Sequence, residues 1–93
     1  MPQVYNRLVG GYPKDAVYVG RPTRWGNPFT VKIHGRAECL ALYGKWIFEP
    51  QQDYLRAAMK RELRGKNLLC WCEPLPCHAH LILKIANSEE ADL

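Results

Sequence analysis

Three cysteines and two histidines lie close together near the C-terminal end of this 93-residue chain. Three thiols and an imidazole are the ligand set of a Cys3His zinc site, and a bound metal would stabilise a domain whose core is small. Structural zinc sites usually take cysteine pairs roughly two to four residues apart, whereas this cluster contains a Cys-x-Cys pair and a cysteine that directly precedes a histidine. Zinc binding is therefore one interpretation of the cluster. Its candidate metal ligands are Cys70, Cys72, Cys77, His78 and His80.

A second interpretation gives Cys77 and His78 a catalytic role. Cys77 is expected at the N-terminus of the last helix beside an imidazole, and both surroundings favour the thiolate, which is the nucleophilic form of cysteine. A third interpretation is purely structural, because a buried thiol behaves as a small apolar side chain and Cys70 suits the core of a strand. We assign Cys39, which stands alone in an expected helix, to the core on the same grounds.

A second group of residues with binding chemistry occupies residues 20–29, which read GRPTRWGNPF. Guanidinium groups match phosphate and carboxylate oxygens, a tryptophan can stack on a nucleobase, and glycines allow a close approach. The alternative is a structural loop whose tryptophan is buried, whose arginines pair with carboxylates and whose asparagine forms an Asx turn. The candidate ligand-binding residues are Gly20, Arg21, Arg24, Trp25 and Asn27.

The N-terminal part of the chain predicts short strands around this loop. Residues 3–9 suit an edge strand. Residues 16–19 are β-branched and aromatic and are followed by a glycine, which is typical of a buried strand. Residues 29–33 alternate apolar and polar side chains, which predicts a half-buried strand after the loop.

Helices are predicted for most of the remaining chain. Residues 37–48 carry an apolar stripe at three- and four-residue spacing, and a proline separates this helix from a second one over residues 50–64. Gly65 suits the C-cap of the second helix. Residues 67–72 predict a buried strand, and residues 81–86 predict a short last helix. The apolar stripe of the second helix consists of Leu55, Ala58, Met59 and Leu63.

This order of elements predicts a small α/β domain with a parallel pair of strands and helices packed on the sheet, similar to half of a Rossmann fold. Ligands of such sheets bind beyond the carboxyl ends of the strands. Both segments with binding chemistry directly follow a predicted strand, so we expect them to converge at that edge.

The length of the chain suits one domain, residues 1–93, with a core over about residues 3–87 and an acidic tail at residues 88–93. The net charge of +4 favours anionic partners only mildly. No apolar run reaches the roughly 18 residues that cross a bilayer, and the N-terminus does not resemble a secretory signal. We therefore expect a cytosolic protein that does not bind membranes and whose cysteines are thiols or metal ligands rather than disulfides.

Together the two segments resemble domain-of-unknown-function family 4326, whose members are small proteins of phages and bacteria. The family's patterns VYVGRPxxWGNPF and LRGKxLxCWCxPxxCH match residues 17–29 and 63–78 of this chain. Members usually carry an acidic residue two places after the histidine, where this chain has His80, so His80 would have to replace that acid as ligand or base. The resemblance implies that both segments matter, and a phage origin would imply a host-takeover or anti-defence role.

The residues favour a site for a phosphate-bearing ligand, either a nucleotide or a nucleic acid, between residues 20–29 and residues 70–78. The N-terminus of the last helix is expected to add backbone donors to this site. Whether the site catalyses a reaction is left open. The alternative is a zinc-stapled module without catalysis that binds nucleic acid or a host protein.

Overall fold

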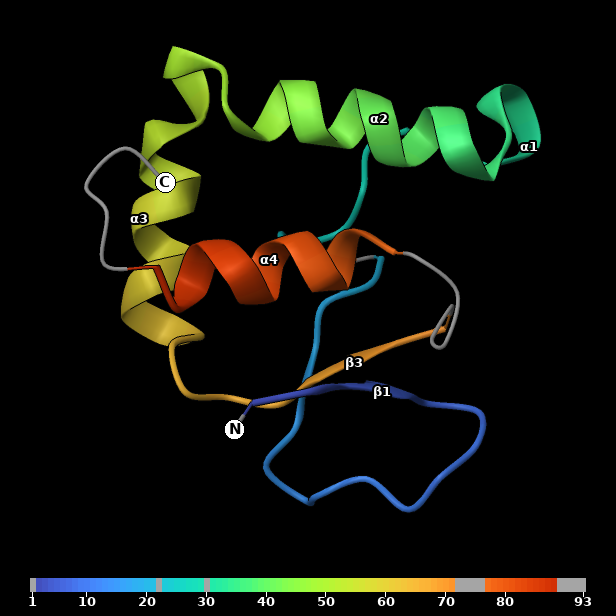
Figure 1. The fold of residues 1–93 in the computed structure, drawn as a ribbon, viewed down its shortest axis with the longest axis vertical. Coiled ribbons are helices and arrows are strands. Elements are labelled where there is room, and N and C mark those ends of the chain that lie inside the picture. Colours follow the sequence, from blue (N-terminus) through green and yellow to red (C-terminus); the bar gives the residue numbers. More distant parts are fainter. Residues whose placement is uncertain (1, 22, 30, 72–76, 89–93) are drawn as a thin grey trace.

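A computed structural model describes residues 2–21, 23–29, 31–71 and 77–88. Within them, a three-stranded sheet is covered by helices (Figure 1). Its strands are β1 (Val4–Asn6), β2 (Val17–Tyr18) and β3 (Leu68–Cys70). The strand order is β1-β3-β2, and β3 is parallel to both neighbours, with Leu69 opposite Tyr5 and Tyr18. The predicted α/β class with parallel strands is confirmed.

The helical elements of the described residues follow in chain order. They are α1 (Val31–His34), α2 (Arg36–Ile47), the short 3-10 helix η1 (Pro50–Gln52), α3 (Asp53–Glu62) and α4 (His78–Ala86). In Figure 1, α4 lies between the sheet and α2, and α3 crosses the end of α4. Helix α4 contacts β1, β3, α2 and α3, so it is the element around which the core is built.

The core forms where the apolar faces of these elements meet α4. Ala79, Ile82 and Ile85 of α4 are fully buried, as is Leu68 of the central strand. Each large aliphatic side chain buried in this way stabilises the fold by roughly 1.5–3 kcal/mol. The predicted apolar stripe of the second helix and the predicted core position of Cys39 are both confirmed by burial.

The element boundaries agree with the sequence in part. Helix α2 lies within one residue of its predicted bounds, whereas the predicted helix at 50–64 is divided into η1 and α3. Gly65 has a φ of +76°, a conformation that favours glycine after a helix. Helix α4 begins three residues earlier than predicted, at His78, because the Cys77 side chain caps its N-terminus. None of the helices in the described part of the chain is long and apolar enough to span a membrane.

The strand predicted for residues 29–33 is wrong, because the chain forms the short helix α1 from Val31 to His34. Just before it, the Asn27 side chain accepts a hydrogen bond from the Phe29 amide at 2.9 Å, which forms a turn where the strand was expected to begin. The apolar residue Ile33 is 76% exposed, so the alternating pattern does not correspond to a buried face.

An arginine holds the corner between α2 and α3. The Arg56 residue is only 9% exposed, and its guanidinium donates to the carbonyl oxygens of Ile47 at 2.6 Å and Glu49 at 3.1 Å. It also forms an ion pair with Asp53. Because the last carbonyl groups of a helix have no partner within the helix, Arg56 satisfies the carbonyl oxygen of Ile47, the last residue of α2.

Candidate ligand pocket

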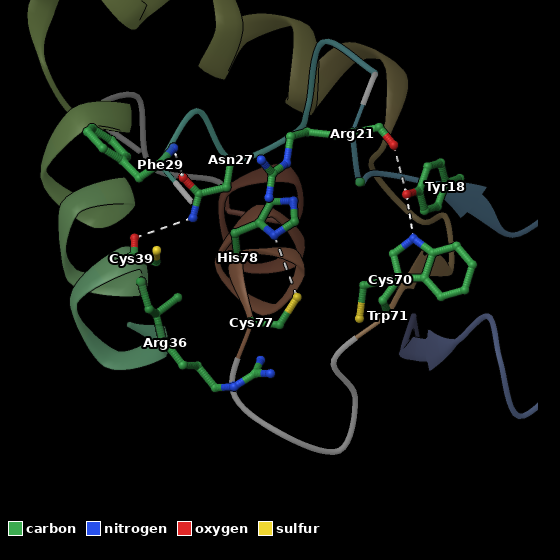
Figure 2. Close-up of a pocket in the computed structure, with 12 residues that line it drawn as sticks. Tyr18, Arg21, Asn27, Phe29, Arg36, Cys39, Cys70, Trp71, Cys77 and His78 are labelled. Atoms are coloured by element: carbon green, nitrogen blue, oxygen red, sulfur yellow. Dashed lines mark hydrogen bonds between the residues drawn. The ribbon is translucent and has the colours of Figure 1, made fainter. Parts of the chain in front are cut away.

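A pocket of about 320 Å³ lies at the carboxyl ends of β2 and β3 (Figure 2). One part of its wall comes from residues 20–29 and the start of α2, and the other from the end of β3 and the first residues of α4. The predicted site residues that line it are Gly20, Arg21, Asn27, Cys70, Cys77 and His78. The two segments with binding chemistry therefore meet at one concavity.

Tight turns and two glycines shape the loop side of the pocket. The Thr23 side chain and amide both donate to the Gly20 carbonyl oxygen, at 2.5 and 3.0 Å. A Cβ atom on Gly20 would collide with the ring of Tyr18, and one on Gly26 would lie 2.9 Å from Cγ of Arg21. Both glycines are therefore required by neighbouring side chains that line the pocket, Tyr18 and Arg21.

The Asn27 side chain is used to hold the loop. Its carboxamide oxygen accepts from the Phe29 amide, and its nitrogen donates to the Cys39 carbonyl oxygen in α2 at 3.3 Å. Asn27 lines the pocket, yet both ends of its side chain have protein partners. The Asx-turn interpretation of Asn27 agrees with this geometry.

Arg21 and Arg36 supply the positive charge at the pocket. Figure 2 shows them entering from different elements, Arg21 from the loop and Arg36 from the first residue of α2. Neither forms an ion pair with a carboxylate of the described residues, whereas Arg24, Arg56 and Arg61 all do. The pocket therefore contains two guanidinium groups whose charge the described residues leave uncompensated.

His78 and Cys77 form a hydrogen-bonded pair at the first turn of α4. The Nε2 atom of His78 lies 2.9 Å from the Val19 carbonyl oxygen, and Nδ1 lies 3.6 Å from Sγ of Cys77. Since a carbonyl oxygen only accepts, Nε2 carries the proton, and in the neutral ring Nδ1 is left as an acceptor for the thiol. The pair thus has the arrangement of a thiol, a base and a group that orients the base.

The surroundings of His78 favour its neutral form. Burial lowers the pKa of His78 below its usual value, the hydrogen bond to Val19 opposes this, and the charges of Arg21 and His80 lower the pKa further. The Tyr43 ring meets His78 edge to face at 5.3 Å, and burial, with a contribution from Cys77, raises the pKa of the Tyr43 phenol. Its hydroxyl has no hydrogen-bond partner among the described residues.

The N-terminus of α4 offers fewer backbone donors than the sequence suggested. The Ala79 amide donates to Sγ of Cys77 at 3.4 Å, and the His80 amide donates to the Cys77 carbonyl oxygen at 3.1 Å. Two of the amide groups expected to face a ligand are therefore occupied within the helix end itself. The positive end of the helix dipole still lies at the pocket, because Cys77 and His78 line it.

Two residues that the sequence assigned to the ligand do not line the pocket. Trp25 is 6% exposed and belongs to the hydrophobic core. Arg24 stacks over its ring at 4.4 Å and pairs with Glu62 at 2.6 Å. Arg24 and Trp25 thus have the partners that the structural interpretation of the loop predicts. His80 is exposed and is likewise not part of the pocket wall.

The zinc interpretation remains a prediction. Cys70, Cys77 and His78 all line the pocket, but Cys72 lies outside the described residues. Among the residues that the structure does describe, no group of three or more histidine, cysteine or acidic side chains is arranged to hold a metal ion.

Sequence reasoning did not select Tyr18, Arg36 and Trp71, which also line the pocket. For Arg36 a signal existed, because a cation at the first residue of a helix is opposed by the helix dipole and so has a cost to stability. Trp71 also had a signal, since it separates two cysteines at the end of a predicted strand, where ligands of parallel sheets bind.

The fold and the pocket together define a small α/β domain with an arginine-lined cavity at the ends of its parallel strands. Comparison with known families identifies the family of the chain: it belongs to the family described as "Domain of unknown function (DUF4326)", whose model matches residues 6–88. A relative in Enterobacteria phage T4, an "Uncharacterized 12.4 kDa protein in nrdA-td intergenic region", is 34% identical over 83 residues. That match covers 87% of this chain and 77% of the phage protein. No solved structure matches the chain.

Proposed function

We propose that the protein binds a phosphate-bearing ligand of the nucleotide class in this pocket. The proposal rests above all on Arg21 and Arg36, which come from two elements, line one pocket and have no carboxylate partner among the described residues. A guanidinium without a protein acceptor favours an anion with several oxygens, because its planar fork of donors matches phosphate. The pocket volume of about 320 Å³ also suits a small ligand.

The remaining charges at the pocket support the same ligand. The lowered pKa of His78 favours a neutral imidazole at neutral pH, so the charge that an anion meets comes from the arginines and from the N-terminus of α4. The Cys77–His78 pair adds the components of nucleophilic chemistry, since Nδ1 of His78 is placed to accept the thiol proton. If the ligand reacts in this pocket, we assign Cys77 as the nucleophile and His78 as its base.

The replacements Arg21→Gln and Arg36→Gln test the proposal. Each removes a charge and most donors without adding bulk, and we expect each to weaken the binding of inorganic pyrophosphate and AMP by about 10- to 100-fold. Binding is measured by isothermal titration calorimetry at about 0.15 M salt, where exposed charges more than roughly 8 Å apart are largely screened.

The matched control is Arg24→Gln, which makes the same change in the same loop outside the pocket. We expect its affinity to stay within about twofold of the original protein, as long-range charge effects are weak at moderate salt. The proposal is wrong if the original protein binds neither compound, or if Arg24→Gln reduces affinity as much as Arg21→Gln.

A second candidate is a zinc-stapled module that binds nucleic acid or a host protein without catalysis. Cys70, Cys77 and His78 line the same pocket, but the described residues alone are not arranged to hold a metal ion, so this candidate requires a further ligand such as Cys72, which lies outside the described residues. Elemental analysis of protein purified without a histidine tag distinguishes the candidates, because a zinc site requires about one zinc per chain. Either candidate is compatible with an accessory or anti-defence role in the cytosol of an infected host.

A further inference from the structure

Trp71 presents an aromatic surface that is nearly half exposed. It directly follows β3, lines the pocket, and is 46% exposed, whereas the preceding residues Leu69 and Cys70 are buried. An indole ring left this exposed contributes less to stability than a fully buried one, because the hydrophobic gain scales with the apolar area removed from water. Its place at the pocket wall therefore points to contact with a ligand.

The exposed ring of Trp71 is nevertheless held in one orientation. Its Nε1 donates to the Tyr18 hydroxyl at 2.6 Å, and the two rings meet edge to face with centroids 6.3 Å apart. The Tyr18 hydroxyl in turn donates to the Arg21 carbonyl oxygen at 2.9 Å (Figure 2). Trp71 and Arg21 thus belong to one hydrogen-bonded unit, and a ring fixed in advance loses little entropy when a ligand stacks on it.

A third arginine lies beside these rings. The guanidinium carbon of Arg7 is 4.7 Å from the centroid of the Tyr18 ring and 5.3 Å from that of Trp71. The Arg7 amide donates to the Cys70 carbonyl oxygen at 2.8 Å, which continues the β1–β3 pairing beyond the end of β1. Arg7 thereby supports the aromatic pair through cation–π contacts and adds positive charge beside the pocket.

We propose that Trp71 stacks on the nucleobase of a nucleotide whose phosphate is bound by Arg21 and Arg36. This inference rests on the proposed phosphate site and adds the base and the residue that recognises it. Every nucleobase has a flat face that can stack on an indole, so this contact discriminates nucleotides from other phosphates. A pocket of about 320 Å³ has room for one nucleotide unit, either free or as part of a single strand.

The test compares nucleotides with ribose phosphate in variants of Trp71. In the original protein, we expect AMP and UMP to bind about tenfold more tightly than ribose phosphate, because one stacked base contributes on that order. In Trp71→Ala, AMP and UMP should bind no more tightly than ribose phosphate, whose own affinity should stay unchanged. Trp71→Phe keeps an aromatic face and should retain part of the preference for AMP and UMP. Trp46→Phe, outside the pocket wall, is the control and should retain all of it.

Thermal unfolding of each variant shows whether it is folded. If Trp71→Ala does not fold, the test rests on the affinities of Trp71→Phe for AMP, UMP and ribose phosphate. If a short single-stranded oligonucleotide binds more tightly than UMP, and its binding depends on Trp71 in the same way, the natural ligand is a nucleotide within a single strand. If the two bind equally tightly, the natural ligand is a free nucleotide. The inference is overturned if ribose phosphate binds as tightly as AMP while Arg21→Gln still weakens both. If no phosphate compound binds at all, both the proposed function and this inference are wrong.

Discussion

Two sets of arginines in this protein have opposite surroundings. Arg56 in the α2–α3 corner is buried, donates to the carbonyl oxygens of Ile47 and Glu49, and pairs with Asp53. Arg21 and Arg36 at the pocket are exposed, and neither has a carboxylate partner among the described residues. The same side chain closes a helix end in one place and leaves its charge available in the other.

The difference shows that the acceptors around an arginine decide its role. Arg56 meets the Ile47 carbonyl group that the end of α2 leaves unsatisfied, so its hydrogen bonds stabilise the native fold itself. The pocket arginines contribute no such bonds, and Arg36 even stands at a helix N-terminus, where the dipole opposes a cation. We therefore expect replacements in the corner to change stability and replacements at the pocket to change binding.

The largest expected effect is that of Arg56→Met on stability. Methionine keeps an unbranched side chain but removes every donor, which leaves the buried Ile47 carbonyl oxygen without its Arg56 partner, so we expect the free energy of unfolding to fall by about 2 kcal/mol. Urea denaturation followed by circular dichroism measures the change. Arg61→Met on the same helix is the control, because Arg61 is exposed and its loss should cost less than about 0.5 kcal/mol.

The same measurement on the pocket variants completes this comparison. Arg21→Gln and Arg36→Gln should leave the free energy of unfolding within about 0.5 kcal/mol, since surface substitutions without partners rarely change it more. A loss as large as that of Arg56→Met would mean that the pocket arginines are structural and would remove the basis of the comparison.

A smaller effect is expected for Gly26→Ala, which acts on the pocket through Arg21. The new Cβ would lie 2.9 Å from Cγ of Arg21, so that side chain must move. We expect AMP to bind about three- to tenfold more weakly, a loss of order 1 kcal/mol, with stability lowered by a similar amount.

Gly44→Ala is the matched control for the glycine replacement. A Cβ on Gly44 meets only the Leu81 side chain, at 4.0 Å, and alanine favours a helix over glycine. This variant should therefore bind AMP normally and be no less stable than the original protein. Equal loss of affinity in both variants would show that Gly26→Ala does not act through Arg21.

The smallest expected effect is the dependence of the free energy of unfolding on pH that His78 causes. Because burial lowers the pKa of His78 in the folded protein, the unfolded chain binds more protons at acidic pH. The free energy of unfolding should therefore fall as pH decreases through about 6.5 toward the lower pKa of the folded state, by at most about 1.4 kcal/mol per pH unit. His78→Gln should remove this part of the slope in the presence of a chelator, and the exposed His80→Gln should not.

Local patterns predicted the helices better than the strands. The apolar stripe around Tyr43 and Ile47 specified α2 to within one residue, because a helix is stabilised by contacts along its own face. The strand expected at residues 29–33 failed because a strand requires a partner, and the Asx turn at Asn27 forms where it was expected to begin. The two segments with binding chemistry meet at the strand ends as expected, but Trp25 belongs to the core whereas Trp71 lines the pocket.

The sequence by itself determined the α/β class, the parallel strands and the family, because these depend on residue order, periodicity and two extended motifs. Only the tertiary structure decided which arginines and which tryptophan face the pocket. Arg24 and Arg21 are three residues apart in the same loop, but Glu62 from a distant helix pairs with one of them. Which charges a folded protein leaves uncompensated depends on contacts between elements far apart in the chain, and no local pattern records those contacts.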